Sequence, residues 1–83
     1  HTAAADALRG AVVELRKRSG QTQRELAVAL GREQSYVGRI ETGQRRIDLV
    51  EWISICRACR VDPQAETGKL VAALIGSMPP RKR

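Results

Sequence analysis

Four polar residues between positions 34 and 42 carry hydrogen-bonding groups that a helix would present on one side. Glutamine, serine and threonine side chains both donate and accept hydrogen bonds, and an arginine guanidinium donates two in parallel. Base edges in the major groove of DNA present matching donors and acceptors. Each residue alone is equally typical of a solvated helix surface. The four candidate base-reading residues are Gln34, Ser35, Arg39 and Thr42.

The charge of the chain favours an acidic partner. Fifteen Lys and Arg stand against nine Asp and Glu, which gives a net charge of +6 over 83 residues. Residues 16–46 alone hold eight basic and three acidic side chains. Such a basic stretch is either a solvated surface or a surface for nucleic acid. Membrane attachment is disfavoured because the chain has one Trp, one Tyr and no Phe as anchors.

No apolar run approaches the length of a membrane span. The longest covers six positions, 70–75, whereas a transmembrane helix needs about 18 or more. We therefore expect a cytoplasmic protein that does not enter a membrane.

Two cysteines, Cys56 and Cys59, form a lone C-x-x-C pair. A zinc site would need two further ligands, and the only histidine is His1. A redox pair would be expected at the start of a helix, whereas these residues fall late in a helical pattern. We predict two packing residues, no metal and no cofactor. Since there is also no nucleophile–base pair and no phosphate-binding glycine loop, we do not expect an enzyme.

Hydrophobic periodicity predicts five short helices and no strand, an all-α fold. The first spans residues 3–18 and ends at Ser19-Gly20. Thr22 and Glu25 form a capping box that begins the second helix, which Gly31 closes as a left-handed residue. The third helix is predicted over residues 33–42, with Val37, Ile40 and part of Tyr36 facing the core.

Asp48 and Glu51 repeat the capping-box pattern and begin a fourth helix, predicted to bury Leu49, Trp52, Ile53, Cys56 and Cys59. Asp62-Pro63 begins a fifth helix. Gly68 leaves two alternatives, a helix running to Ile75 or a break with Thr67 capping a second piece. We predict one domain over residues 1–78, a C-terminal helical region over about 63–76, and a basic disordered tail over 79–83.

The second and third predicted helices are separated only by Gly31-Arg32. A tight glycine-containing turn of this kind sets two helices across each other in a helix-turn-helix. The small side chain of Ala27 permits the close crossing. We therefore predict a helix-turn-helix over about residues 22–42.

The stretch Gln21–Ala27, Leu30-Gly31, Gln34–Val37 and Arg39–Gly43 resembles the lambda-type phage repressor and Cro family, the Xre-like helix-turn-helix proteins. With its flanking helices the resemblance covers about residues 6–62. It implies a compact five-helix lambda-repressor-like domain. It also implies a transcriptional regulator of repressor or controller type that reads specific double-stranded DNA with its third helix. Relatives that act as antitoxins leave an alternative, a module that neutralises a partner protein and binds DNA only secondarily.

The resemblance also implies roles for single residues. Gln34 and Ser35 occupy base-reading positions, and Arg39 falls where family members reach a base or a phosphate. Arg16 and Glu41 would form a largely buried ion pair between the first and third helices. Arg32, Glu33 and Gly38 depart from the family pattern, and Gly38 either lets the helix approach the bases or loosens it. The implied phosphate-binding residues are Gln23, which also braces the third helix, Arg24, Tyr36, Gln44, Arg45 and Arg46, together with the backbone amides of the loop 43–46.

A single recognition helix contacts too few base pairs to be selective in a genome, so we expect a homodimer on an inverted repeat. The fifth helix has an apolar stripe wide enough to supply the interface. The alternative is that this stripe packs entirely on the chain's own helices. The candidate dimerisation residues are Trp52, Leu70, Val71, Leu74 and Ile75, with Ile55 or Cys59 extending the surface.

Overall fold

Five α-helices follow one another along the chain in the computed structural model, which describes residues 2–80. They are α1 (Ala3–Arg18), α2 (Gln23–Ala29), α3 (Tyr36–Glu41), α4 (Leu49–Ala58) and α5 (Pro63–Ser77). No strand occurs within residues 2–80, so the predicted all-α fold with five helices is confirmed. None of the helices in this range combines the length and the apolar character needed to cross a membrane.

The helix starts follow the predicted caps. Thr22 and Asp48 each form a complete capping box, with Glu25 and Glu51 respectively. Asp62 caps α5 through the amide of Gln64, with Pro63 as the first helical residue. Thr2, for which no role was predicted, caps α1 by accepting a hydrogen bond of 3.0 Å from the amide of Ala5. These side chains satisfy backbone donors that would otherwise lack a partner.

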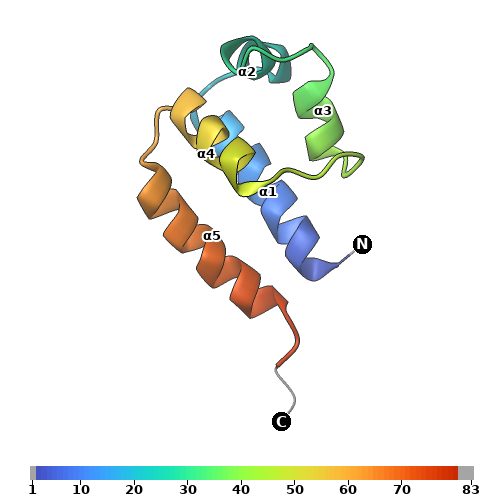
Figure 1. Cartoon of the computed structure of the whole chain (residues 1–83), viewed down its shortest axis with the longest axis vertical. Coiled ribbons are helices and arrows are strands. Elements are labelled where there is room, and N and C mark those ends of the chain that lie inside the picture. The colour runs from blue at the N-terminus through green and yellow to red at the C-terminus, as the bar shows by residue number, and fades with distance from the viewer. Residues whose placement is uncertain (1, 81–83) are drawn as a thin grey trace.

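α5 is one continuous helix that runs antiparallel to α1 (Figure 1). Gly68 does not break it, and Thr67 does not cap a second piece. Instead the Thr67 hydroxyl accepts a hydrogen bond of 2.9 Å from Trp52 Nε1, which joins α5 to α4. The predicted tail, residues 79–83, lies partly outside the described residues, since 81–83 are not described.

The start of α3 differs from the prediction. The helix begins at Tyr36 and not at residue 33, so α2 and α3 are separated by residues 30–35 and not by Gly31-Arg32 alone. Gly31 adopts the predicted left-handed conformation, with φ 66°. The amide of Tyr36 donates to Glu33 O in a turn, and the first helical bond runs from Arg39 N to Ser35 O. Glu33 lacks the short side chain that would cap a helix start at this position.

The core gathers one face of each helix, including Val12 and Leu15 of α1, Leu26 and Ala27 of α2, and Tyr36, Val37 and Ile40 of α3. The predictions for α4 were partly wrong. Leu49 is 63% exposed and Ile53 38% exposed, whereas Ile55 is fully buried. Ile53 lies about 100° around the helix from Trp52. A helical wheel cannot show that the core stops short of the first turn, where Leu49 lies.

Cys56 and Cys59 are buried free thiols, as predicted for packing residues. Burial raises the pKa of Cys56 to about 11. A thiol that remains protonated at neutral pH is a poor nucleophile.

Two glycines inside helices give a matched pair of substitutions. A Cβ on Gly38 would lie 3.4 Å from Gln23 Oε1, an ordinary contact, and a Cβ on Gly10 would meet nothing within 4 Å. Alanine restricts the unfolded chain, so each Gly→Ala change should raise the free energy of unfolding by about 0.5–1 kcal/mol. Denaturant unfolding measures both. The family resemblance implies that the third helix reads bases. Gly38→Ala should then leave DNA binding unchanged, and a loss of affinity confined to this variant would mean that bases approach Gly38.

Candidate nucleic-acid interface

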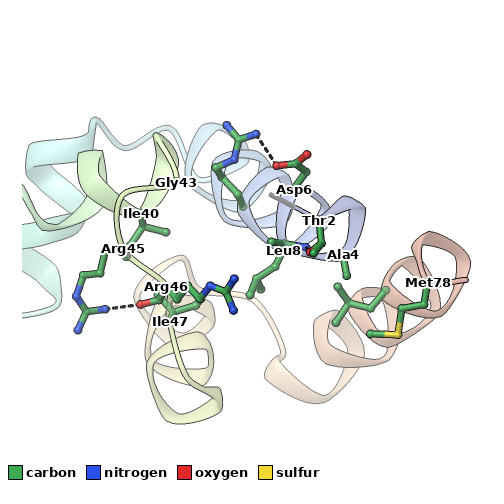
Figure 2. A pocket seen from close by; sticks show the side chains of 13 residues that line it. Thr2, Ala4, Asp6, Leu8, Ile40, Gly43, Arg45, Arg46, Ile47 and Met78 are labelled. Atoms are coloured by element: carbon green, nitrogen blue, oxygen red, sulfur yellow. Dashed lines mark hydrogen bonds and ion pairs between the residues drawn. The ribbon is translucent and has the colours of Figure 1, made fainter.

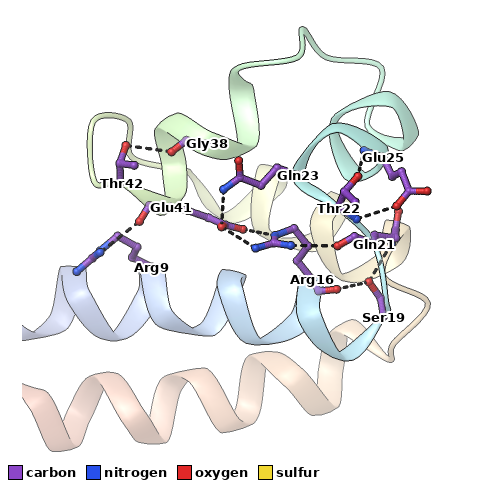
Figure 3. A network of polar contacts seen from close by, with 10 residues as sticks. All are labelled: Arg9, Arg16, Ser19, Gln21, Thr22, Gln23, Glu25, Gly38, Glu41 and Thr42. Atoms are coloured by element: carbon purple, nitrogen blue, oxygen red, sulfur yellow. Dashed lines mark hydrogen bonds and ion pairs between the residues drawn. The ribbon is translucent and has the colours of Figure 1, made fainter.

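A bidentate ion pair fixes α3 against α1. Arg16 Nε donates to Glu41 Oε2 at 2.6 Å, and Arg16 Nη2 donates to Glu41 Oε1 at 3.0 Å (Figure 3). The side chains are only 14% and 7% exposed. Burial alone would raise the pKa of Glu41, but hydrogen bonds from Arg16 and Gln23 outweigh burial and lower this pKa. The pair therefore stays ionised, and it sets the orientation of α3 in the fold.

Gln23 at the start of α2 belongs to the same network. Its Nε2 donates to Glu41 Oε1 at 2.9 Å, so the first residue of α2 is tied to the last residue of α3. Arg9 Nη1 adds a bond of 3.2 Å to the backbone oxygen of Glu41. The geometry agrees with the bracing role that the resemblance implies for Gln23.

The four candidate base-reading residues are all exposed, but only Arg39 lies within α3. Gln34 precedes the helix, and Ser35 is its N-cap residue without a side-chain capping bond. The Thr42 hydroxyl donates within the helix, to Gly38 O at 3.0 Å. Its lone pairs remain, so Thr42 can accept a hydrogen bond but has no spare donor.

Arg39 forms an ion pair of 3.1 Å with Glu33, in which the side chains are 52% and 65% exposed. Exposed pairs of this kind contribute only about 0–1 kcal/mol. A base or phosphate that offers a better acceptor can therefore displace Glu33 from Arg39.

Arg24 of α2 lies beside Gln34. With the Gln34 amide oriented so that its oxygen faces Arg24, this oxygen accepts from Arg24 Nε at 3.0 Å and from Nη1 at 3.2 Å. The amide NH2 of Gln34 then points away from Arg24 with both donors available. Arg24 of α2 thus orients the side chain of Gln34, which lies outside α3.

Three of the phosphate-binding assignments need correction. One of them is Arg45, whose guanidinium is bound by Glu51 and by the backbone oxygen of Arg46. Tyr36 is only 3% exposed, and its hydroxyl donates to Glu51 Oε2 at 2.8 Å, so it offers no free donor to a phosphate. The backbone amides of Gly43, Gln44 and Arg45 donate to carbonyls of Ile40 and Arg39 at the end of α3. These amides close the helix and are not available to DNA.

Glu51 makes contacts beside the candidate interface that sequence reasoning missed, because this residue was assigned only a capping role. Its Oε1 accepts from the Asp48 amide at 3.0 Å, while its Oε2 accepts from Tyr36 and lies 2.8 Å from Arg45 Nη2. The hydrogen bond from Arg45 is the largest of the effects that lower the pKa of Glu51 to about 2. Glu51 is therefore ionised at neutral pH and forms an ion pair with the Arg45 guanidinium.

Arg46 differs from its neighbour. Its guanidinium makes no hydrogen bond or ion pair within residues 2–80. It lines a pocket of about 460 Å³ between the start of α1, the loop after α3 and the end of α5 (Figure 2). The apolar wall of this pocket comes from Leu8, Ile40, Ile47, Leu74 and Met78. Arg46 is thus the basic side chain of this loop with free donors.

No group of three or more His, Cys, Asp or Glu side chains suited to a metal ion occurs in the part of the chain that the structure describes.

Comparisons with known proteins match this arrangement. A family model described as a helix-turn-helix domain covers residues 5–70. An XRE-family like protein from Pseudomonas syringae pv. tomato str. DC3000 is 43% identical, with 84% of this chain and 85% of that chain covered and a TM-score of 0.77. No curated protein sequence matches the chain.

Two further solved structures share the fold. The restriction-modification controller protein C.AhdI from Aeromonas hydrophila is 34% identical over 80% of this chain and 99% of its own, with a TM-score of 0.65. The clp gene regulator ClgR from C. glutamicum is 26% identical over 94% of this chain and 96% of its own, with a TM-score of 0.70.

Proposed function

Because the chain belongs to the XRE family of helix-turn-helix proteins, we propose that it is a transcriptional regulator that reads specific double-stranded DNA sequences with α3 and the turn before it. The observation that carries the proposal is the bracing of α3 by Arg16, Glu41 and Gln23 beside an exposed row of Gln34, Ser35 and Arg39. A helix that is held rigidly and carries exposed, hydrogen-bonding side chains is suited to base reading. The similarity to a gene regulator and to a controller protein supports regulation.

The first test is binding to duplex DNA over a range of salt concentrations. A protein that neutralises phosphates releases counterions, so the logarithm of the affinity should fall linearly with the logarithm of the salt concentration. A steep negative slope supports the proposal. Binding that is absent, or that does not depend on salt, contradicts it. Since regulation requires access to the chromosome, the proposal includes a cytoplasmic location.

We also propose that the protein acts as a homodimer on an inverted repeat. The interface we predicted needs revision, because Trp52 is only 2% exposed and Leu70 only 8%. Ile55 and Cys59 are also buried, with no more than 4% of either residue exposed. These residues lie in the core of a single chain. Leu74 also packs against that core. The alternative, that the apolar stripe of α5 packs on the chain's own helices, is therefore correct for Leu70 and Leu74.

The apolar side chains that remain exposed on α4 and α5 are the revised candidates for the interface. Trp52 of α4 contacts Thr67 of α5. The chain runs in roughly opposite directions in these two helices (Figure 1). The exposed apolar residues of α4 lie within three positions of Trp52, and those of α5 follow Thr67 by four and eight positions, about one and two helical turns. We infer that one partner surface covers both helices. We define this α4–α5 apolar surface by Leu49, Val50, Ile53, Val71 and Ile75, which are 38–72% exposed.

Charged substitutions on α5 test this surface. Val71→Asp with Ile75→Asp should convert the dimer to a monomer, because both carboxylates would be desolvated at the interface. Sedimentation at micromolar concentration measures the change. Val28→Asp is the control, since Val28 is 71% exposed and belongs to α2, which lies apart from α5 in Figure 1. A dimer that survives the α5 changes, or is lost equally in the control, contradicts the assignment.

A further inference from the structure

Two arginines, one before α3 and one after it, each place a guanidinium over the same aromatic ring. The guanidinium carbon of Arg32, in the turn before α3, lies 4.1 Å from the centroid of the Tyr36 ring. The guanidinium carbon of Arg45, in the loop after α3, lies 4.8 Å from the same centroid. Both separations are within the range of a cation–π interaction. Because Tyr36 is buried, its ring is a fixed support for both cations.

One carboxylate serves both arginines, but unequally. Arg45 Nη2 lies 2.8 Å from Glu51 Oε2, and Arg45 Nη1 donates to the backbone oxygen of Arg46 at 2.8 Å. Arg32 Nη1 is 3.7 Å from the same Glu51 oxygen, which is an ion-pair distance too long for a hydrogen bond. The guanidinium of Arg45 is therefore bound by other groups of the protein. The Arg32 side chain is 44% exposed and its donors remain available.

We propose that Arg32 binds a backbone phosphate of DNA, and that Tyr36 and Glu51 are positioning residues that hold its guanidinium in place. The proposal rests on the proposed DNA-binding function and adds a contact to it. Two arginines and one carboxylate leave a net positive charge at a fixed point. A planar guanidinium that is already stacked loses little conformational freedom when it binds a phosphate in a bidentate manner.

The location of Arg32 favours phosphate over a base. Tyr36 is on the core-facing side of α3, whereas Ser35 and Arg39 are on the exposed side. A guanidinium that lies over the Tyr36 ring is thus beside the base-reading residues and not among them. Phosphates line the edges of the major groove, at the sides of a helix that lies in it.

The test is the salt dependence of binding to random duplex DNA. Arg32→Ala should reduce the magnitude of the slope of log affinity against log salt by about 0.9, the value for one phosphate contact. Arg57→Ala is the matched control, since Arg57 is an exposed arginine of α4 and its removal changes the net charge equally. The control should leave the slope at the wild-type value.

Two further variants separate contact from positioning. Arg32→Lys should keep the slope but lower the affinity, because an ammonium does not stack or bind in a bidentate manner. Tyr36→Leu removes the ring without changing charge and should lower the affinity for random DNA, with folding checked by thermal unfolding. If Tyr36→Leu does not fold, the lysine variant alone decides the positioning role.

The outcomes distinguish this inference from the proposed function. A wild-type protein with a steep slope, whose Arg32→Ala variant matches Arg57→Ala, overturns the Arg32 contact and leaves DNA binding intact. An Arg32→Lys variant that binds as tightly as wild type overturns the stacking argument. A wild-type protein without salt-dependent binding overturns both proposals.

Discussion

Replacement of Arg16 by methionine is expected to lower the free energy of unfolding by about 3 kcal/mol or more. The substitution would leave the carboxylate of Glu41, 7% exposed in the fold, without the two hydrogen bonds that Arg16 donates. An uncompensated buried charge costs far more than an ion pair contributes when it is intact. Equilibrium unfolding in denaturant measures the loss.

The double variant Arg16→Met with Glu41→Leu is the control for this prediction. Replacing both partners by apolar side chains of similar size removes the stranded charge, so most of the lost stability should return. A single variant as stable as wild type would show that the pair does not hold α3. A double variant as unstable as the single one would show that the lost hydrogen bond from Arg16 Nη1 to the backbone oxygen of Gln21, 3.0 Å in the fold, and not the stranded charge, determines the effect.

Replacement of Arg39 by alanine is expected to weaken binding to a specific site by about 1–3 kcal/mol, the range for a lost bidentate contact to a base. Binding to random duplex DNA should change little. Competition between the two DNA types in one titration measures the difference. Equal losses on both would place Arg39 on a phosphate, which is the other role that the family resemblance allows.

Glu33 supplies the control for Arg39. The ion pair between these two residues is exposed on both sides, so the Glu33→Gln variant should keep the preference for the specific site. If this variant loses specificity as Arg39→Ala does, Glu33 orients the guanidinium for base reading and is not merely displaced from it.

Local signals in the sequence were sufficient for most of the fold. The capping boxes at Thr22 and Asp48 and the glycine at 31 depend on residues within four positions of each other, so a single sequence contains the whole interaction. The burial of Val12, Leu26 and Val37 follows from helical periodicity in the same way. The resemblance to the family supplied the two long-range contacts that were anticipated, between Arg16 and Glu41 and between Gln23 and α3.

The errors concern interactions that depend on distant parts of the chain. Helix propensity could not show that α3 begins at Tyr36, because the turn before it depends on how α2 and α3 cross. The role of Glu51 depends on Tyr36, which is 15 positions away in sequence. Trp52 is buried and donates a hydrogen bond to Thr67 of another helix. The pattern of one helix cannot show such a partner, so the sequence placed Trp52 on the dimer surface. Amphipathicity indicates which side of a helix is apolar but not which neighbour covers it.

Selection of bound sites from a pool of random duplex DNA tests the central claim most directly. The account predicts that the selected sequences converge on an inverted repeat whose half-sites are centred about 10 base pairs apart, one turn of B-DNA. The Arg39→Ala variant should lose preference at a defined position in each half-site. A pool that shows no enriched sequence, while the protein still binds DNA in a salt-dependent manner, would contradict sequence-specific reading by α3.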